Sequence, residues 1–364
     1  MSIDCRIKVD RKDFLLDVNL LIARSGIIGI TGPSGSGKTT LLRAMAGLEK
    51  SSDGYLKVGD SLWHNGEKFT PAHQRKIGYV FQEASLFSHL SVRDNINYGL
   101  RRTPEEKRKV AIDYAIELRG IGPLLKRKPS QLSGGEKLRV AIARALAVSP
   151  KILLMDEPLS ALDSARKREF LPYLENLHKA LDIPIIYVSH SLDELARLAD
   201  HLILLENGKV TASGEIADML TRSDLPLSHS DDASSLINAH IAGHDDEFEL
   251  SYIDFSGGRF TVPKRDLPAN CSVRIKIAAR DVSLTKEKQS GTSILNIFPA
   301  TVEEITPESK SQVMVRLDAQ GTIFLSRITR KSSQLLELTK GSKVFAQIKT
   351  VALWNSDEYR QNEH

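Results

Sequence analysis

One stretch decides the fold of the first part of this chain: Gly32-Pro33-Ser34-Gly35-Ser36-Gly37-Lys38-Thr39-Thr40. It contains the pattern G-x-x-x-x-G-K-[ST] of a P-loop, in which glycines let successive backbone N–H groups turn toward phosphate oxygens. An apolar run, Ile27 to Thr31, precedes it, and a helical pattern from Lys38 to about Ala46 follows. A strand, a glycine-rich turn and a helix are the setting that this motif requires. We therefore expect a nucleotide-binding site here.

A second pattern supplies the carboxylates that such a site needs. The apolar run Ile152 to Met155 leads directly into Asp156 and Glu157. An acid at the carboxyl end of a buried strand beside a P-loop can hold Mg²⁺, and we expect this role for Asp156 together with the Thr39 hydroxyl. Glu157 is expected to polarise the attacking water as a general base. Lys38 is expected to reach the terminal phosphates of ATP.

The spacing of apolar residues indicates two kinds of structure along the chain. Up to about residue 228, continuous apolar runs such as Ile185 to Val188 alternate with amphipathic helices, which is typical of parallel strands buried on both faces. Residues 84 to 150 are helical without a clear strand. Further along, the apolar period falls toward two, as in Val273, Ile275 and Ile277, which is typical of short strands.

These patterns predict an α/β P-loop ATPase domain with a helical subdomain at about 84–150, followed by a small all-β domain with an OB-like barrel. The expected boundaries are 1–228 for the ATPase domain, 229–287 for a linker and β segment, and 288–354 for the last domain. The polar run from Leu225 to Asp232 is interpreted as linker. A capping box, Ser191-Leu192-Asp193-Glu194, is expected to start the helix that follows the Ile185–Val188 strand.

Composition excludes several other classes of protein. The chain has 364 residues, of which 41% are hydrophobic and 26% charged, so a collagen-like, disordered or disulfide-scaffold chain is excluded. Fifty Lys and Arg against 46 Asp and Glu give a formal charge of +4, which is too balanced to indicate a nucleic-acid partner. No segment approaches the roughly 20 apolar residues that span a bilayer. Any membrane-spanning part is therefore expected to belong to another chain.

A series of motifs in the first 220 residues resembles that of ABC-transporter ATPases, in the family's order. Leu132-Ser133-Gly134-Gly135-Glu136 is similar to the signature motif, and it opens a helix just before the strand that ends at Asp156. Gln82 resembles the Q-loop glutamine, and His190 resembles the switch histidine. The stretch similar to the D-loop is Ser160-Ala161-Leu162-Asp163. The P-loop and the pair of acids complete the set.

The resemblance implies roles for these residues. Ser133, Gly134 and Gly135 lie at a helix N-terminus, where N–H groups and a hydroxyl can face the γ-phosphate of ATP held by the opposite subunit. A head-to-tail homodimer that encloses two ATP molecules is therefore implied. His190 is expected to hydrogen-bond the γ-phosphate and the attacking water. Gln82 is expected to contact Mg²⁺ and to relay closure of the dimer to the membrane subunit.

Two positions stand out when the sequence is compared with the family's usual pattern. Leu138 stands where related ATPases usually carry glutamine, and it is expected to pack instead of forming hydrogen bonds. The family often stacks adenine on an aromatic ring upstream of the P-loop, and Phe14 is the only aromatic residue there. Its place between Asp13 and Leu15 is more typical of a residue in a strand core.

The last part of the chain indicates the cargo. Three stretches, Thr292 to Asn296, Phe324 to Ser332 and Gly341 to Lys349, resemble the molybdate-binding Mop module over about residues 288–354. Molybdate and tungstate are tetrahedral dianions, which need hydroxyl and amide donors and a cation. The residues that the resemblance assigns to this role are Ser293, Asn296, Ser326, Thr329, Ser332 and Lys349.

The combined prediction is an ABC-type molybdate-transporting ATPase that binds ATP and Mg²⁺. It would act through a separate membrane permease dimer, which an extracytoplasmic molybdate-binding protein supplies with molybdate or tungstate. The chain would lie on the cytoplasmic face of the inner membrane as a peripheral subunit. Two alternatives stay open: the ATPase subunit of an importer for another anion or a metal, and a molybdate-binding regulatory ATPase that is not coupled to transport.

Overall fold

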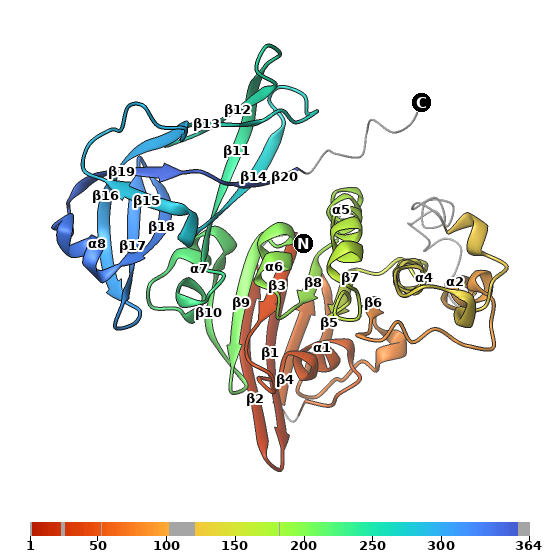
Figure 1. Ribbon diagram of the computed structural model, residues 1–364. Helices are drawn as coiled ribbons and strands as arrows, with labels where there is room; N and C mark the ends of the chain where they lie inside the picture. Colours follow the sequence, from red (N-terminus) through yellow and green to blue (C-terminus); the bar gives the residue numbers. More distant parts are fainter. Residues whose placement is uncertain (1, 23–25, 52, 102–120, 182, 356–364) are drawn as a thin grey trace. The chain divides into compact units, whose positions relative to one another are not determined.

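The computed structural model describes residues 2–22, 26–51, 53–101, 121–181 and 183–355 (Figure 1). The chain divides into two compact units, Met1–Gly214 and Glu215–His364. This division falls before the expected boundary at residue 228. The helix α7 (Ile216–Thr221) and the 3-10 helix η5 (Pro226–His229) therefore belong to the second unit.

The first unit contains two β-sheets. The antiparallel sheet has the order β2-β1-β4-β5, made of β1 (Ile3–Arg11), β2 (Phe14–Ile22), β4 (Asp53–Val58) and β5 (Ser61–Asn65). The second sheet has the order β10-β9-β3-β8-β7-β6. Its strands are β3 (Ile27–Thr31), β6 (Ile77–Val80), β7 (Ile152–Asp156), β8 (Ile185–Val188), β9 (His201–Glu206) and β10 (Lys209–Glu215). Strands β6, β7, β8, β3 and β9 are paired in parallel.

The parallel strands are buried as their apolar sequences predict. Every residue of β3, β7 and β8 is buried, and α1 (Lys38–Ala46) places Leu41, Leu42 and Met45 in the same core. Since these neighbouring strands are parallel, their carboxyl ends meet at one edge of the sheet. That edge brings together the P-loop, the two acids after Met155 and the turn that contains His190.

The region between residues 84 and 150 is helical wherever the structure describes it. It contains α2 (Val92–Leu100), η3 (Gly122–Leu124), η4 (Pro129–Gln131) and α4 (Gly134–Leu146), and no strand occurs in its described part. Val92, Ile96, Val140 and Ala143 form a small core between these elements. Residues 102–120 of the expected subdomain lie outside the described residues. The helices α5 (Ser164–Ala180) and α6 (Leu192–Leu198) follow β7 and β8.

The second unit is built mainly of strands, in two five-stranded sheets. The first has the order β13-β12-β11-β14-β20, with β11 (Ser234–Asp245), β12 (Leu250–Phe255), β13 (Gly258–Pro263), β14 (Ser272–Ala278) and β20 (Ala352–Asn355). The second has the order β15-β19-β16-β17-β18, with β15 (Val282–Thr285), β16 (Asn296–Pro307), β17 (Gln312–Ala319), β18 (Thr322–Thr329) and β19 (Lys343–Ile348). Short helices η6 (Ala279–Asp281) and α8 (Arg330–Leu335) complete the unit.

The second of these sheets curls until its two edge strands meet. The buried Ser326 Oγ on β18 donates a hydrogen bond of 2.7 Å to the carbonyl oxygen of Val282 on β15. The rings of Phe260, Phe298 and Phe324 pack in the core that both sheets share. This curled all-β architecture confirms the expected OB-like domain.

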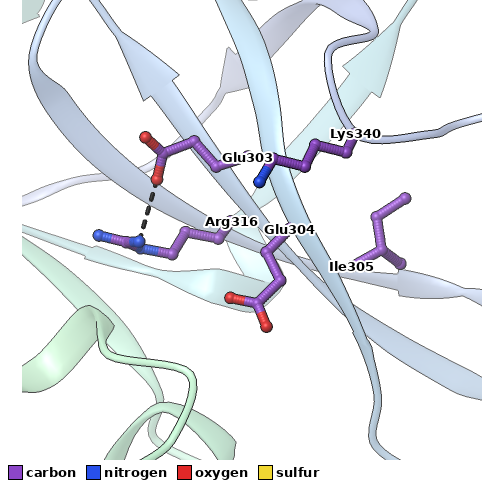
Figure 2. Close-up of a pocket in the computed structure, with 5 residues that line it drawn as sticks. All are labelled: Glu303, Glu304, Ile305, Arg316 and Lys340. Atoms are coloured by element: carbon purple, nitrogen blue, oxygen red, sulfur yellow. Dashed lines mark ion pairs between the residues drawn. The ribbon is translucent and has the colours of Figure 1, made fainter.

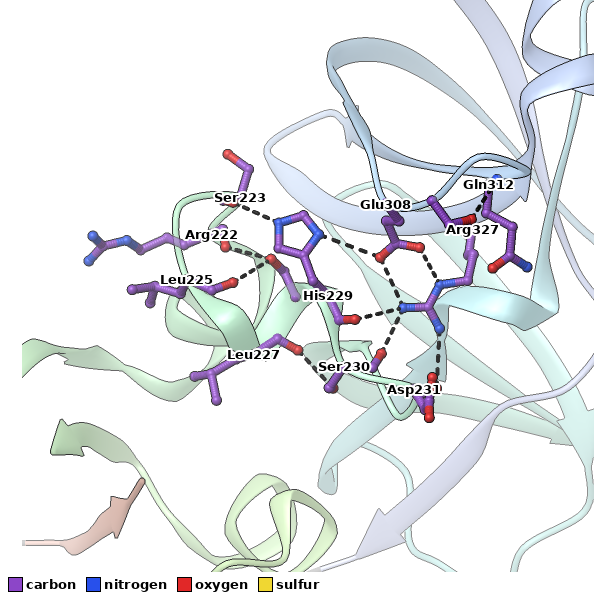
Figure 3. Close-up of polar contacts among 12 residues, drawn as sticks. Arg222, Ser223, Leu225, Leu227, His229, Ser230, Asp231, Glu308, Gln312 and Arg327 are labelled. Atoms are coloured by element: carbon purple, nitrogen blue, oxygen red, sulfur yellow. Dashed lines mark hydrogen bonds and ion pairs between the residues drawn. The ribbon is translucent and has the colours of Figure 1, made fainter. Parts of the chain in front are cut away.

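The segment interpreted as a polar linker is packed structure (Figure 3). Ser228 is fully buried, and its Oγ donates to the carbonyl oxygens of Arg222 and Leu225. Arg327 on β18 binds the following turn through the carbonyl oxygens of His229, Ser230 and Asp231. The linker prediction for 225–232 is wrong, because the short polar residues bind backbone carbonyls and an arginine from a distant strand.

Candidate active site

The P-loop has a backbone that only glycine tolerates at two positions. Gly32 has φ 149° and Gly37 has φ 101°, both in the left-handed half of the map. A Cβ atom at Gly32 would collide with the carbonyl oxygen of Leu205, and one at Gly37 would lie 2.6 Å from Phe14 Cζ. Gly37 immediately precedes α1 and has no side chain to cap it. The N–H groups of the first turn therefore point toward the loop, where phosphate oxygens can accept from them.

Lys38 is held over the loop by backbone carbonyls. It is 7% exposed, and its Nζ donates hydrogen bonds of 2.8 Å to Gly32 O and Pro33 O. The third N–H donor of the ammonium group makes only a long contact of 3.5 Å with Ser36 Oγ, which a phosphate oxygen can replace. Burial lowers the pKa of Lys38, and the nearby carboxylates of Glu157 and Asp156 oppose that shift. Of the other loop residues, Ser36 is buried, Thr40 is half-buried, and Pro33, Ser34 and Gly35 are exposed.

Asp156 joins the P-loop to the neighbouring strands. Thr39 Oγ1 donates to Asp156 Oδ1 at 3.1 Å, and Tyr79 Oη donates to Asp156 Oδ2 at 3.3 Å. Burial raises the pKa of Asp156, while these two hydrogen bonds lower it. Tyr79 was not among the predicted site residues. Its pairing with Leu154 on β7 places it there, a contact between distant segments for which the sequence offers no local signal.

Glu157 is fixed by its backbone and faces His190. Its φ is 46°, its N–H donates to Val188 O at 3.0 Å, and its carbonyl accepts from Ser160 Oγ at 2.8 Å. The side chain is 22% exposed, and Oε2 lies 3.3 Å from His190 Nδ1. The structure therefore brings together the predicted base and the predicted switch histidine.

The signature motif forms a capped helix start. Ser133 is the N-cap of α4, where its Oγ accepts from Glu136 N at 3.3 Å and its N–H donates to Glu136 Oε2 at 2.6 Å. Ser133 and Gly134 are exposed, and Gly135 is buried. Gln82 is also exposed, just after β6. The exposed Ser133 and Gly134 can meet a phosphate that another chain supplies.

The structure also shows the surroundings of Leu138 and Phe14. Leu138 is 4% exposed within α4, which confirms the expectation that it packs. Phe14 begins β2 as a half-buried residue, and its ring lies against Gly37 of the P-loop. It thus packs in the strand core and borders the phosphate-binding loop.

The predicted oxyanion residues lie in the second unit in unequal settings. Asn296 is buried and bonds Thr261 through both amide atoms, while Ser326 is buried and bonded to Val282. Thr329 caps α8, and its Oγ1 lies 2.8 Å from Ser332 Oγ. Ser293 and Lys349 are exposed. The structure thus joins Thr329 to Ser332 and gives the hydroxyl of Ser326 and the amide of Asn296 partners within the chain.

An open pocket of about 590 Å³ lies elsewhere in the second unit (Figure 2). Its lining residues are Glu303, Glu304, Ile305, Arg316 and Lys340. Glu303 pairs with Arg316 at 3.0 Å, and Glu304 accepts a hydrogen bond from Ser223. Two glutamates beside two basic residues leave no excess positive charge, so this pocket does not favour a dianion.

Comparison with known proteins identifies both parts of the chain. Residues 15–160 match the ABC transporter family model, and residues 292–353 match the TOBE domain. No helix in the described ranges is long and apolar enough to cross a membrane.

Several relatives match almost the whole chain. The molybdenum import ATP-binding protein ModC of Albidiferax ferrireducens is 49% identical over 350 residues, which cover 96% of this chain and 95% of that protein. The protein of the same name from Aromatoleum aromaticum is 51% identical over 342 residues, covering 93% and 91%. That from Bordetella parapertussis is 51% identical over 357 residues, covering 97% of each. This chain, an ABC-transporter ATPase with a C-terminal TOBE domain, belongs to the family of molybdenum import ATP-binding proteins.

Proposed function

We propose that this protein hydrolyses ATP to drive the import of molybdate through a separate membrane permease. One observation supports this chemistry most strongly. Five functional side chains lie at or after the carboxyl ends of three adjacent parallel strands, namely Lys38, Thr39, Asp156, Glu157 and His190. The cargo is supported by the relatives, which are 49–51% identical and are named for molybdenum import.

In this proposal, Lys38 and the first turn of α1 bind the phosphates of ATP. The ammonium, held between two carbonyls, presents its remaining N–H and its charge to the terminal phosphates. The N–H groups of the first turn add further donors and the positive end of the helix dipole. Both groups are in place before ATP binds, so little reorganisation is needed to stabilise charge that develops on the phosphate.

In this proposal, Glu157 activates the attacking water as a general base. Its backbone is bonded on both sides, which fixes the point from which the side chain extends, and its carboxylate can accept the proton of the attacking water. His190, 3.3 Å away, orients that carboxylate from one side. The ring of His190 is 64% exposed, so its other edge remains accessible to the substrate.

The oxygen atoms beside the P-loop are of the type that Mg²⁺ prefers. Thr39 Oγ1 and Asp156 Oδ1 lie 3.1 Å apart, and both can bind a hard cation. The fit is supported by this donor set, and we propose Gln82 as a further oxygen donor. When bound, Mg²⁺ neutralises charge on the β- and γ-phosphate oxygens.

The active form proposed here is a homodimer. The exposed Ser133 and Gly134 at the N-terminus of α4 would complete the ATP site of the opposite subunit. The dimer would bind a permease dimer at the cytoplasmic face of the inner membrane, supplied by an extracytoplasmic molybdate-binding protein. In this proposal residues 288–354 form an oxyanion-binding module for molybdate or tungstate, and the residues assigned to it are Ser293, Asn296, Ser326, Thr329, Ser332 and Lys349.

The proposal is tested by ATP hydrolysis and transport together. Purified wild-type chain should hydrolyse ATP, and vesicles that contain the complete importer should take up molybdate only when ATP is supplied inside the compartment that holds this chain. Uptake of another anion instead of molybdate would favour the importer of different cargo. Hydrolysis without any coupled uptake would favour the regulatory ATPase.

A further inference from the structure

A buried carboxylate lies behind the switch histidine. Glu194, on α6, is 4% exposed. Its Oε2 accepts hydrogen bonds from Tyr187 Oη at 2.9 Å and Ser189 Oγ at 2.8 Å, and its Oε1 accepts one from Lys167 Nζ at 2.8 Å. A buried carboxylate with three donors is fully compensated, and its loss would leave those donors unpaired.

This arrangement corrects the expected capping box at the start of α6. Ser191 Oγ does accept from Glu194 N, at 3.4 Å, as the box requires. The Glu194 side chain does not return to Ser191 N, which donates to Ser189 Oγ at 3.1 Å instead. The carboxylate turns away because Tyr187, Ser189 and Lys167 offer it stronger donors inside the unit.

The hydrogen bonds that involve Glu194 reach the residues just before and just after His190 in the sequence. Ser189 binds the carboxylate directly, and Ser191 N binds the hydroxyl of Ser189. Ser189 N also donates to Ile30 O on β3, 3.2 Å away. The residues on either side of His190 are therefore held in place, while its ring faces Glu157.

Lys167 extends the network to the D-loop. It lies on α5, whose N-cap is Asp163, the last residue of the D-loop stretch. Asp163 Oδ1 accepts from Arg166 N at 2.9 Å, one residue before Lys167. The ion pair of Lys167 with Glu194 thus connects the helix that follows the D-loop to the turn that carries His190.

We propose that Glu194 is a positioning residue for ATP hydrolysis, which sets the His190 turn against Glu157 and couples it to α5 through Lys167. The inference rests on the proposed ATPase function. It predicts that loss of the carboxylate charge slows the hydrolytic step and leaves ATP binding almost unchanged, because the P-loop makes none of the contacts described for Glu194.

The chain provides a matched control for a merely structural role. Arg197 on α6 binds Glu175 on α5 at 2.6 and 3.2 Å, and both side chains are 11% exposed. This second ion pair joins the same two helices, and its two bonds involve neither Ser189 nor Ser191. A variant at Glu175 therefore weakens the contact of α5 with α6 as Glu194→Gln does, but removes none of the hydrogen bonds described for Ser189 and Ser191.

The experiment compares full-length Glu194→Gln, Glu175→Gln and Ser189→Ala with wild type, measuring kcat and KM for ATP and the melting temperature. We expect kcat to fall about tenfold or more in Glu194→Gln with KM within about twofold, and to stay within about twofold in Glu175→Gln. Ser189→Ala should lower kcat several-fold with KM within about twofold.

Three outcomes would overturn the inference. Glu194→Gln and Glu175→Gln could lower kcat equally, Glu194→Gln could leave kcat unchanged, or the effect could fall entirely on KM. If Glu194→Gln does not fold, Ser189→Ala decides: an unchanged kcat overturns the positioning role, and a reduced one supports it. Absence of hydrolysis in both wild type and Glu175→Gln would instead overturn the proposed function.

Discussion

His190 Nδ1 lies 3.3 Å from Glu157 Oε2, and the two side chains come from the turns after adjacent parallel strands. The Glu157 N–H donates to Val188 O, so the pairing of β7 with β8 continues one residue beyond Asp156. The sheet therefore sets the distance between the two backbone positions from which these side chains extend. Any change that moves one of these strand ends should therefore have a larger effect on the rate of ATP hydrolysis than on the affinity for ATP.

Glu157→Gln should lower kcat about a hundredfold or more while ATP still binds, because an amide cannot accept the proton of the attacking water. Lys38, Thr39 and Asp156 are untouched in this variant and should keep the affinity for ATP. We expect an ATP-bound dimer that is stable on size exclusion, measured beside single-turnover hydrolysis. Turnover near the wild-type rate would show that Glu157 is not the base.

Composite sites make activity a property of the dimer. Lys38→Ala and Ser133→Arg should each be inactive alone, because they damage opposite halves of the same composite site. Mixing them should restore up to about a quarter of wild-type activity, since half of the dimers then contain one intact site. A mixture no more active than its components, or a specific activity that stays unchanged on dilution to the monomer, would contradict the head-to-tail arrangement.

Arg327 should be important for the stability of the second unit. It binds both carboxylate oxygens of Glu308 and three backbone carbonyls, and it is 11% exposed. Arg327→Lys keeps the charge but loses the bidentate geometry, and should cost about 2–4 kcal/mol. Hydrogen exchange of residues 222–231 and the denaturation midpoint of this unit would measure the loss.

A surface pair serves as the control for Arg327. Arg259 binds Asp254 at 2.6 and 2.9 Å, also through two bonds, but is 55% exposed. Arg259→Lys should cost less than about 1 kcal/mol, because water replaces the lost contact. Equal effects of the two substitutions would mean that Arg327 does not anchor the segment after η5.

Molybdate should bind the second unit and slow the ATPase. If only the open form of the dimer binds, cargo at a hundred times its dissociation constant would disfavour closure by about 2.7 kcal/mol. Calorimetric titration of the full chain with molybdate, tungstate and sulfate, followed by ATPase assays with each anion, tests this. Lys349→Ala should weaken binding of molybdate. Silence with molybdate would remove the oxyanion site, and binding without inhibition would remove the feedback.

The sequence predicted the parts of the site that local chemistry defines. Buried apolar runs identified β3, β7 and β8, and the P-loop, the two acids and His190 followed from their positions after these runs. The alternation of Val273, Ile275 and Ile277 likewise identified β14.

The features that the sequence did not predict correctly depend on contacts between residues far apart in the chain. Arg327 lies about a hundred residues from the turn that it binds. The polar residues of that turn therefore have the same composition as a flexible linker when the sequence is considered alone. Glu194 fits a capping box by spacing, yet Lys167 on another helix decides its direction. Tyr79 reaches Asp156 only because β6 pairs with β7.

The most direct test of the central claim is molybdate uptake by cells that lack their own copy of this ATPase. Accumulation of molybdenum should be restored by the wild-type chain and not by Glu157→Gln, at equal amounts of protein and with permease and binding protein present. Glu175→Gln should restore it nearly as well as wild type. Restoration by Glu157→Gln, or no restoration by the wild-type chain, would contradict the account that ATP hydrolysis at this site drives molybdate import.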